Sequence, residues 1–149
     1  MQNETHEMGQ SWNVEIILRG EDGKIKESRN IHNLVTTQGK YHVADQLSSS
    51  PTQTAMGYMG IGTGSTAAAI TDTTLETELD RNALTSRTDA LNIVTYVGNW
   101  AAGDGTGSIT EAGIFNASSS GTMLVRAVFS TINKAALDTL LITWTLTVI

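Results

Sequence analysis

Residues 140–148 read LLITWTLTV, and this stretch decides the fold class. Apolar side chains recur at Leu140, Ile142, Trp144, Leu146 and Val148, and threonine fills the alternate positions from 143 to 147. Successive side chains of a β-strand point to opposite faces, so a period of two predicts a strand with one face in a hydrophobic core. Such a face requires a second layer of structure to cover it.

The same alternation appears at the other end of the chain, where Trp12, Val14, Ile16 and Leu18 are separated by polar residues. The turn sequence GEDG at 20–23 then predicts a hairpin with a polar second strand over 24–29. We expect further strands, each bounded by turn residues, at 55–61, 83–88, 92–100, 109–116 and 122–129, and a short helical turn within 72–80. Several short strands between turns predict a β-sandwich, and we expect a jelly-roll-like one.

Composition agrees with this all-β prediction. The chain of 149 residues has 22 threonines and 12 serines, a single proline, and only 16% charged residues. Threonine is branched at its β-carbon and packs well on a half-buried pleated surface. The length suits one domain. We therefore expect a polar N-terminal arm over 1–11, which lacks periodicity, and one sandwich domain over 12–149.

One short helix is expected around residues 37–48. The hydroxyl of Thr36 or Thr37 can accept from an otherwise unpaired N–H at its start. Val43 and Leu47 lie one turn apart on one face, and the run from 48 to Pro51 ends the helix. A helix of about ten residues is marginal alone, so we expect it to lie against a sheet.

The glycine-rich segment GIGTGS at 60–65 is the first candidate for chemistry. A phosphate-binding loop would end in Gly-Lys-Ser or Gly-Lys-Thr, and no lysine lies between Lys40 and Lys134. The spacing G-x-G-x-G also departs from the dinucleotide-binding pattern. We interpret the segment as a tight structural turn.

No other motif predicts catalysis, a cofactor or a metal. The chain has no cysteine, and His6, His32 and His42 lack the spacing of a metal site. A pair such as Glu76 and Glu78, or Asp104 alone, fits general acid–base chemistry, but solvated charges on a threonine-rich loop are the simpler interpretation. A Ser/His/Asp triad has no nucleophile-elbow motif to support it. We expect no catalytic, cofactor-binding or metal-binding residue, and no enzyme activity.

Charge and hydropathy exclude two classes of partner. The formal net charge is −6 and the basic residues are scattered, whereas nucleic-acid binding requires a basic stripe. The polar, acidic N-terminus differs from a signal peptide, and the longest apolar stretch of about ten residues is too short for a membrane helix. We expect a soluble protein without nucleic-acid or membrane partners.

Contact with other proteins is the remaining class of function. Trp100 borders a glycine-rich loop, and we favour a core position for it over an interface anchor. In the arm, Thr5, His6 and Met8 are candidate interface residues, because an arm can gain affinity by adding a strand to a neighbour. We expect deletion of Met1–Gln10 to leave the fold intact and to weaken assembly.

Five segments in order resemble one known family. They are HNLVTTQGKYHVADQL (32–47), GIGTGSTAA (60–68) followed by DTTLETELDR (72–81), GSITEAGIFN (107–116), GTMLVRAVF (121–129) and INKAALDTLLITWTLTV (132–148). This combination resembles small virion proteins of tailed bacteriophages, described as head decoration, tail or tail-fibre-associated proteins. The resemblance covers roughly residue 14 to the C-terminus and implies a virion structural role without catalytic residues.

The resemblance leads to a specific expectation. The chain would be a capsid decoration (cement) protein on the outside of the head, assembled in the host cytoplasm, bridging subunits of the major capsid protein. We expect a homo-oligomer, a dimer or trimer, because symmetry turns modest affinities into avidity. One alternative is a tail, baseplate or fibre-attachment component with tail or baseplate partners. Another is a carbohydrate-binding sandwich that stacks a sugar on Trp100 or Tyr96.

Overall fold

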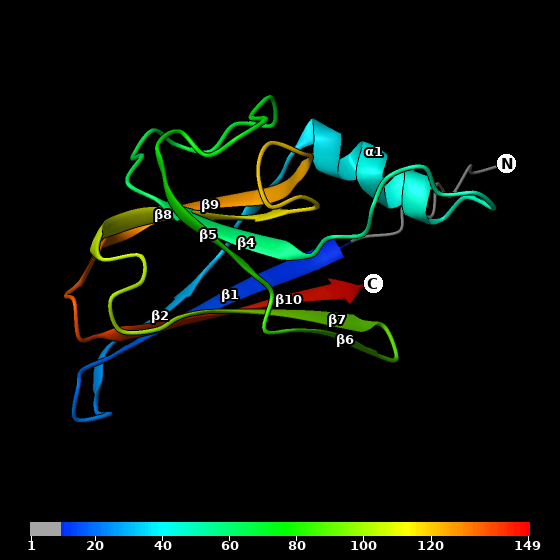
Figure 1. Ribbon diagram of the computed structural model, residues 1–149. Helices are drawn as coiled ribbons and strands as arrows, with labels where there is room; N and C mark the ends of the chain where they lie inside the picture. Colours follow the sequence, from blue (N-terminus) through cyan, green and yellow to red (C-terminus); the bar gives the residue numbers. More distant parts are fainter. Residues whose placement is uncertain (1–9) are drawn as a thin grey trace, which may run out of the picture.

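The computed structural model describes residues 10–149, which form two packed antiparallel sheets and one short helix (Figure 1). The predicted all-β sandwich is confirmed. Its elements are, in chain order, β1 (Gln10–Arg19), β2 (Ile25–Ile31), β3 (Leu34–Val35), α1 (Thr37–Gln46), β4 (Tyr58–Gly62), β5 (Glu78–Ala83), β6 (Ser86–Ala90), β7 (Ile93–Trp100), β8 (Gly107–Phe115), β9 (Met123–Lys134) and β10 (Thr139–Val148).

The first sheet has the strand order β2-β1-β10-β7-β6, with β10 at its centre. Trp144 of β10 pairs with Val14 of β1 on one side and with Tyr96 of β7 on the other. All three side chains face inward and are buried, and the threonines of β10 face outward. The alternation that predicted the fold therefore places its apolar face in the core.

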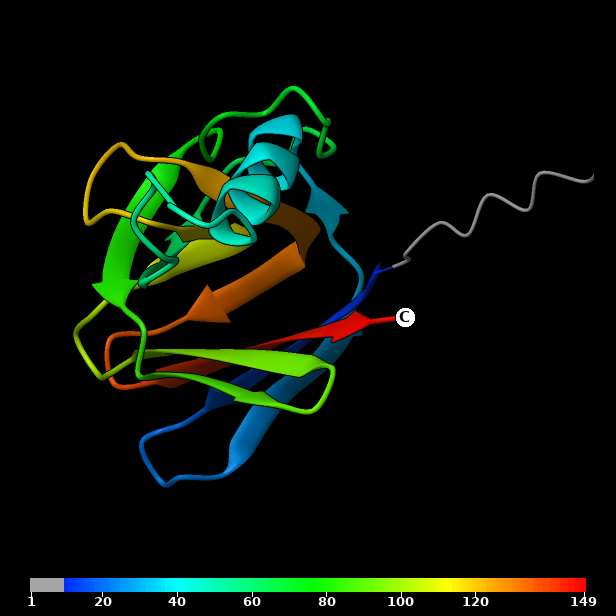
Figure 2. The ribbon, with the colours of Figure 1, turned by 90° about the vertical axis from the view of Figure 1, so that its right-hand side faces the viewer.

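The second sheet has the order β3-β9-β8-β4-β5. From Glu111 to Phe115, five consecutive residues of β8 are buried, so both faces of this strand are covered. The inner face packs on the first sheet. The outer face is covered by the loop between β4 and β5, whose Leu75 packs on Phe115 and Met123, while α1 packs against β9 (Figure 2). The first sheet differs, because no element of residues 10–149 covers its outer face (Figure 1).

Helix α1 forms where the sequence predicted it. The Thr36 hydroxyl accepts from Gly39 N at 2.9 Å and donates to Met123 O at 2.7 Å, so one side chain caps the helix and ties it to β9. Gly39 allows close contact, since a Cβ there would lie 2.0 Å from Leu124 O. Packing against the second sheet thus stabilises a helix too short to persist alone.

Three expectations about local structure were wrong. Strand β1 begins at Gln10, which pairs with Val148, so the expected arm boundary at residue 11 falls inside a strand. Residues 72–80 contain no helical turn, and Glu78 already belongs to β5. The expected strand at 83–88 is divided between β5 and β6, which belong to different sheets and are connected by residues 84–85.

Candidate functional site

A buried carboxylate organises the outer side of the second sheet. Glu111 of β8 is fully buried. Its Oε1 accepts from Gly64 N at 3.0 Å and Thr77 N at 2.8 Å, and its Oε2 accepts from Glu76 N at 3.0 Å. One side chain therefore binds both ends of the loop between β4 and β5, in place of the water that a carboxylate otherwise requires.

Arg126 of β9 completes this network. Its Nε donates to Glu111 Oε2 at 2.9 Å, and its two other nitrogens reach Asp72 Oδ2 at 2.8 Å and Thr66 O at 3.1 Å. Burial alone would lower the pKa of Arg126, but the Asp72 and Glu111 carboxylates raise it above its ordinary value. The guanidinium thus stays charged and holds the middle of the loop.

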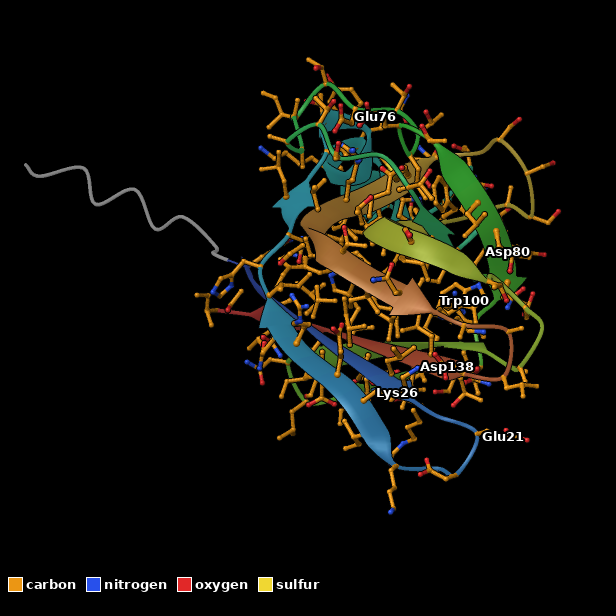
Figure 3. The ribbon with its side chains drawn as sticks, turned by 90° about the vertical axis from the view of Figure 1, so that its left-hand side faces the viewer. Glu21, Lys26, Glu76, Asp80, Trp100 and Asp138 are labelled. Atoms are coloured by element: carbon orange, nitrogen blue, oxygen red, sulfur yellow. The ribbon has the colours of Figure 1, made fainter. Side chains whose placement is uncertain are left out.

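Glu76 is exposed and stabilises the loop between β4 and β5 from its solvent side (Figure 3). It accepts from the backbone N–H and the hydroxyl of Thr66, each at 2.8 Å, and these hydrogen bonds lower its pKa. Glu78 forms an ion pair with Arg81. The two residues considered as an acid–base pair therefore have separate partners.

The glycine-rich segment leaves space for the Glu111 carboxylate. Gly60 and Gly62 lie within strand β4, so the interpretation of 60–65 as a tight turn was wrong. A Cβ at Gly62 would lie 2.5 Å from Glu111 Oε1, and a Cβ at Gly64 would lie 2.6 Å from the same oxygen. The missing side chains make room for the chain's own carboxylate.

A second polar cluster lies along β5, near Trp100 (Figure 3). Burial, a hydrogen bond with Asp104 and the charge of Asp104 together raise the pKa of Asp80. Asn82 Nδ2 donates to Asp104 Oδ2 at 2.7 Å and to Asn99 O at 3.0 Å. Asp80 Oδ2 and Trp100 Nε1 are buried and have no hydrogen-bond partner among residues 10–149. Two carboxyl groups share this cluster, which makes it sensitive to pH.

A pocket of about 420 Å³ opens between α1 and the β6–β7 hairpin. Apolar side chains predominate in its lining, which also contains the charged side chains of Arg87 and Asp89. His42 lines the pocket, with its Nδ1 at 3.1 Å from Gln53 Oε1. A site of this size and polarity fits a single apolar side chain or a small amphipathic molecule.

The outer face of the first sheet is left uncovered by the other elements of the described chain (Figure 1). We use the name outer face for the side chains that alternate with the buried ones in its five strands. Threonine, serine and asparagine predominate there. Its members are Ser11, Asn13, Glu15, Ile17, Arg19, Ile25, Ser28, Asn30, Ser86, Thr88, Ala90, Ile93, Thr95, Val97, Asn99, Thr139, Leu141, Thr143, Thr145 and Thr147.

The structure assigns positions to the remaining candidate residues. Trp100 is fully buried in the core, as favoured from the sequence, and Tyr96 is buried as well. Neither ring therefore presents an exposed face on which a sugar could stack. His32 is exposed in the connection between β2 and β3. Thr5, His6 and Met8 lie outside the described residues.

Within residues 10–149, no three His, Cys, Asp or Glu side chains come together as a metal site would require. No helix of this part of the chain has the length and apolar character needed to span a membrane.

Comparison with known proteins gives no match: no family model, no curated protein and no solved structure is significantly similar to this chain.

The sequence analysis missed Glu111 and Arg126. Each is a single charge in an otherwise apolar strand, in ITEAGIF and MLVRAVF respectively. An isolated charge inside an apolar strand is itself a signal, because burial of a charge requires a partner of opposite sign. It also missed the outer face, although the alternate threonines of β10 already indicated part of it.

Proposed function

We propose that this chain is a structural protein of a tailed-phage virion, a decoration (cement) protein that binds the outside of the head and bridges neighbouring subunits of the major capsid protein. One observation carries the proposal. Within residues 10–149, a wide sheet face with few charges stays uncovered, on a protein whose net charge is −6. Depletion of charge is the compositional mark of surfaces that bind other proteins.

The buried network supports a structural role. Glu111 and Arg126 fix the loop between β4 and β5 at several points, so the second sheet has a rigid, closed exterior. The segments that resemble phage virion proteins include 60–68, 72–81, 107–116 and 121–129, which contain this network. The resemblance therefore falls on residues that build and stiffen the domain, as expected for a building block.

The acidic charge supports an exterior position. Packaged DNA would repel a chain of net charge −6, whereas the outside of a shell imposes no such penalty. Repetition across the shell would add the modest affinity of each copy into avidity. Bridged capsid subunits would then separate less readily on heating.

Binding to heads tests the proposal. Purified recombinant chain is mixed with mature heads that lack it, the particles are pelleted, and their thermal disruption is followed by light scattering. We expect saturable binding and a higher disruption temperature, with an unrelated acidic protein of similar size as the control. Heads that neither bind the chain nor gain stability would contradict the decoration role. Binding to tails or baseplates instead would place the protein there.

A further inference from the structure

The outer face has a charge pattern that complements itself. Among its members only Glu15 and Arg19 are charged. Both belong to β1, and they lie four positions apart, a distance of about 13 Å along a strand. Arg19 donates one hydrogen bond to Gly23 O at 3.1 Å, and neither residue forms an ion pair within residues 10–149.

Apolar side chains lie between and beside these two charges. Ile17 stands midway between them on β1 and pairs with Leu141 of β10. Ile25 of β2, which pairs with Arg19, is 52% exposed. The centre of the charge pattern is therefore an apolar patch on the sheet surface, and burial of such a patch stabilises a contact.

A two-fold axis through this patch would bury its apolar side chains and would also pair the opposite charges on either side of it. If the axis lies in the plane of the contact, perpendicular to the strands and above Ile17 and Leu141, it places β1 of one copy antiparallel over β1 of its partner. Ile17 and Leu141 then face their own counterparts, and Glu15 of each copy faces Arg19 of the other. Packed sheets lie about 10 Å apart, a gap that two long side chains can bridge.

We propose that the outer face binds a second copy of this chain through this two-fold contact, with reciprocal Glu15–Arg19 ion pairs on either side of an Ile17–Leu141 centre. The inference deepens the proposed function and rests on it: the uncovered sheet face would join two copies, and the remaining surface of each copy would bind a capsid subunit, so that the dimer bridges neighbouring subunits. The arrangement is isologous and closed, so it forms pairs and not filaments.

The area of overlap sets the strength of the pair. Five strands spaced about 4.8 Å apart, overlapping over about five residues, give roughly 400 Å² of flat area on each copy. This lies at the low end for specific interfaces, among weak and transient pairs. Free chains should therefore dimerise only at high concentration, and avidity would strengthen the contact on a particle.

Charge exchange tests the contact. Sedimentation equilibrium measures the dimer dissociation constant for wild type, Glu15→Arg, Arg19→Glu and the double variant. Each single variant places like charges opposite each other and should weaken dimerisation about tenfold or more. The double variant restores opposite charges in exchanged positions and should return to within about threefold of wild type. Leu141→Lys, at the centre of the contact, should abolish dimerisation.

Matched controls separate the contact from net charge. Lys40→Glu and Asp89→Arg, both exposed and outside the outer face, repeat the two charge changes and should leave dimerisation unchanged. Thermal unfolding confirms that each variant folds. The inference fails if wild type remains monomeric at about 1 mM, a concentration that detects even weak pairs, or if the double variant stays as weak as the single variants. A monomeric chain that still binds heads would overturn this contact alone, and a dimer that leaves particles bare would overturn only the proposed function.

Discussion

Arg126 Nε lies 2.9 Å from Glu111 Oε2, and this contact joins two buried charges on neighbouring strands of one sheet. The pair also binds a loop, because Glu111 accepts three backbone N–H groups and Arg126 donates to the Thr66 carbonyl. Burial of an ion pair is costly unless every lone pair finds a donor. Here the loop supplies those donors, so the network and the loop stabilise each other.

The first prediction concerns this network. Glu111→Gln removes the charge that faces Arg126 and turns an amide group toward N–H donors. We expect a loss of about 3–5 kcal/mol in the free energy of unfolding, the usual cost of breaking a buried pair. Urea unfolding followed by tryptophan fluorescence measures this loss.

The control is Glu21→Gln, at the exposed tip of the β1–β2 hairpin (Figure 3). It should change the free energy of unfolding by less than about 0.5 kcal/mol. If Glu111→Gln lost no more than this control, the network would not stabilise the fold.

The second prediction concerns the contact between helix α1 and strand β9. Alanine favours a helix over glycine by about 1 kcal/mol, yet Gly39→Ala would place a methyl group 2.0 Å from Leu124 O. We expect the clash to prevail and to lower the free energy of unfolding by about 1–3 kcal/mol.

Ala44→Gly, on the exposed side of the same helix, gives the comparison. It should cost about 1 kcal/mol from helix propensity alone. Thermal unfolding of both variants measures the difference, and a Gly39→Ala protein more stable than wild type would show that α1 does not depend on this contact.

The third prediction concerns pH. The pKa of Asp80 is raised by burial and by the neighbouring Asp104, so the folded state retains a proton that the unfolded state loses. The stabilising contribution of this proton is complete below about pH 4, near the ordinary pKa of the group. It is lost as pH rises through the pKa of the folded state.

Asp80→Asn removes this titration. We expect the variant to match wild type near pH 3.5 and to melt about 2–4 °C higher at pH 7, a modest gain because solvent screens the pair. Melting curves across this range measure the effect. A variant less stable than wild type at pH 7 would mean that the Asp80 charge is favourable where it stands.

The fold could be predicted because its central signals are local. The alternation in β10 follows from burial of one face of a strand, and α1 follows from a capping hydroxyl at Thr36. The glycines at 60–64 misled the prediction because glycine suits both tight turns and close contacts. The deciding partner, Glu111, lies 47 residues after Gly64 in the sequence and adjacent to it in space.

The same distant partner, Glu111, also explains why the segment 72–77 lacks the expected helical turn. Its N–H groups at Glu76 and Thr77 bind Glu111, which holds the backbone in an irregular path that local propensity does not encode. The outer face could not be outlined from the sequence either. It depends on the order of five strands, which sets Ile17 beside Leu141 and places uncharged side chains around Glu15 and Arg19.

We propose above that this chain belongs to the exterior of a phage particle. Immunogold electron microscopy of purified virions, with antibody raised against the recombinant chain, tests it most directly. We predict gold particles distributed over the heads, with a virion lacking the chain as the control. Label restricted to the tail would move the protein to a tail or fibre position. Bare particles, from an infection whose cell lysate still reacts with the antibody, would contradict the virion role.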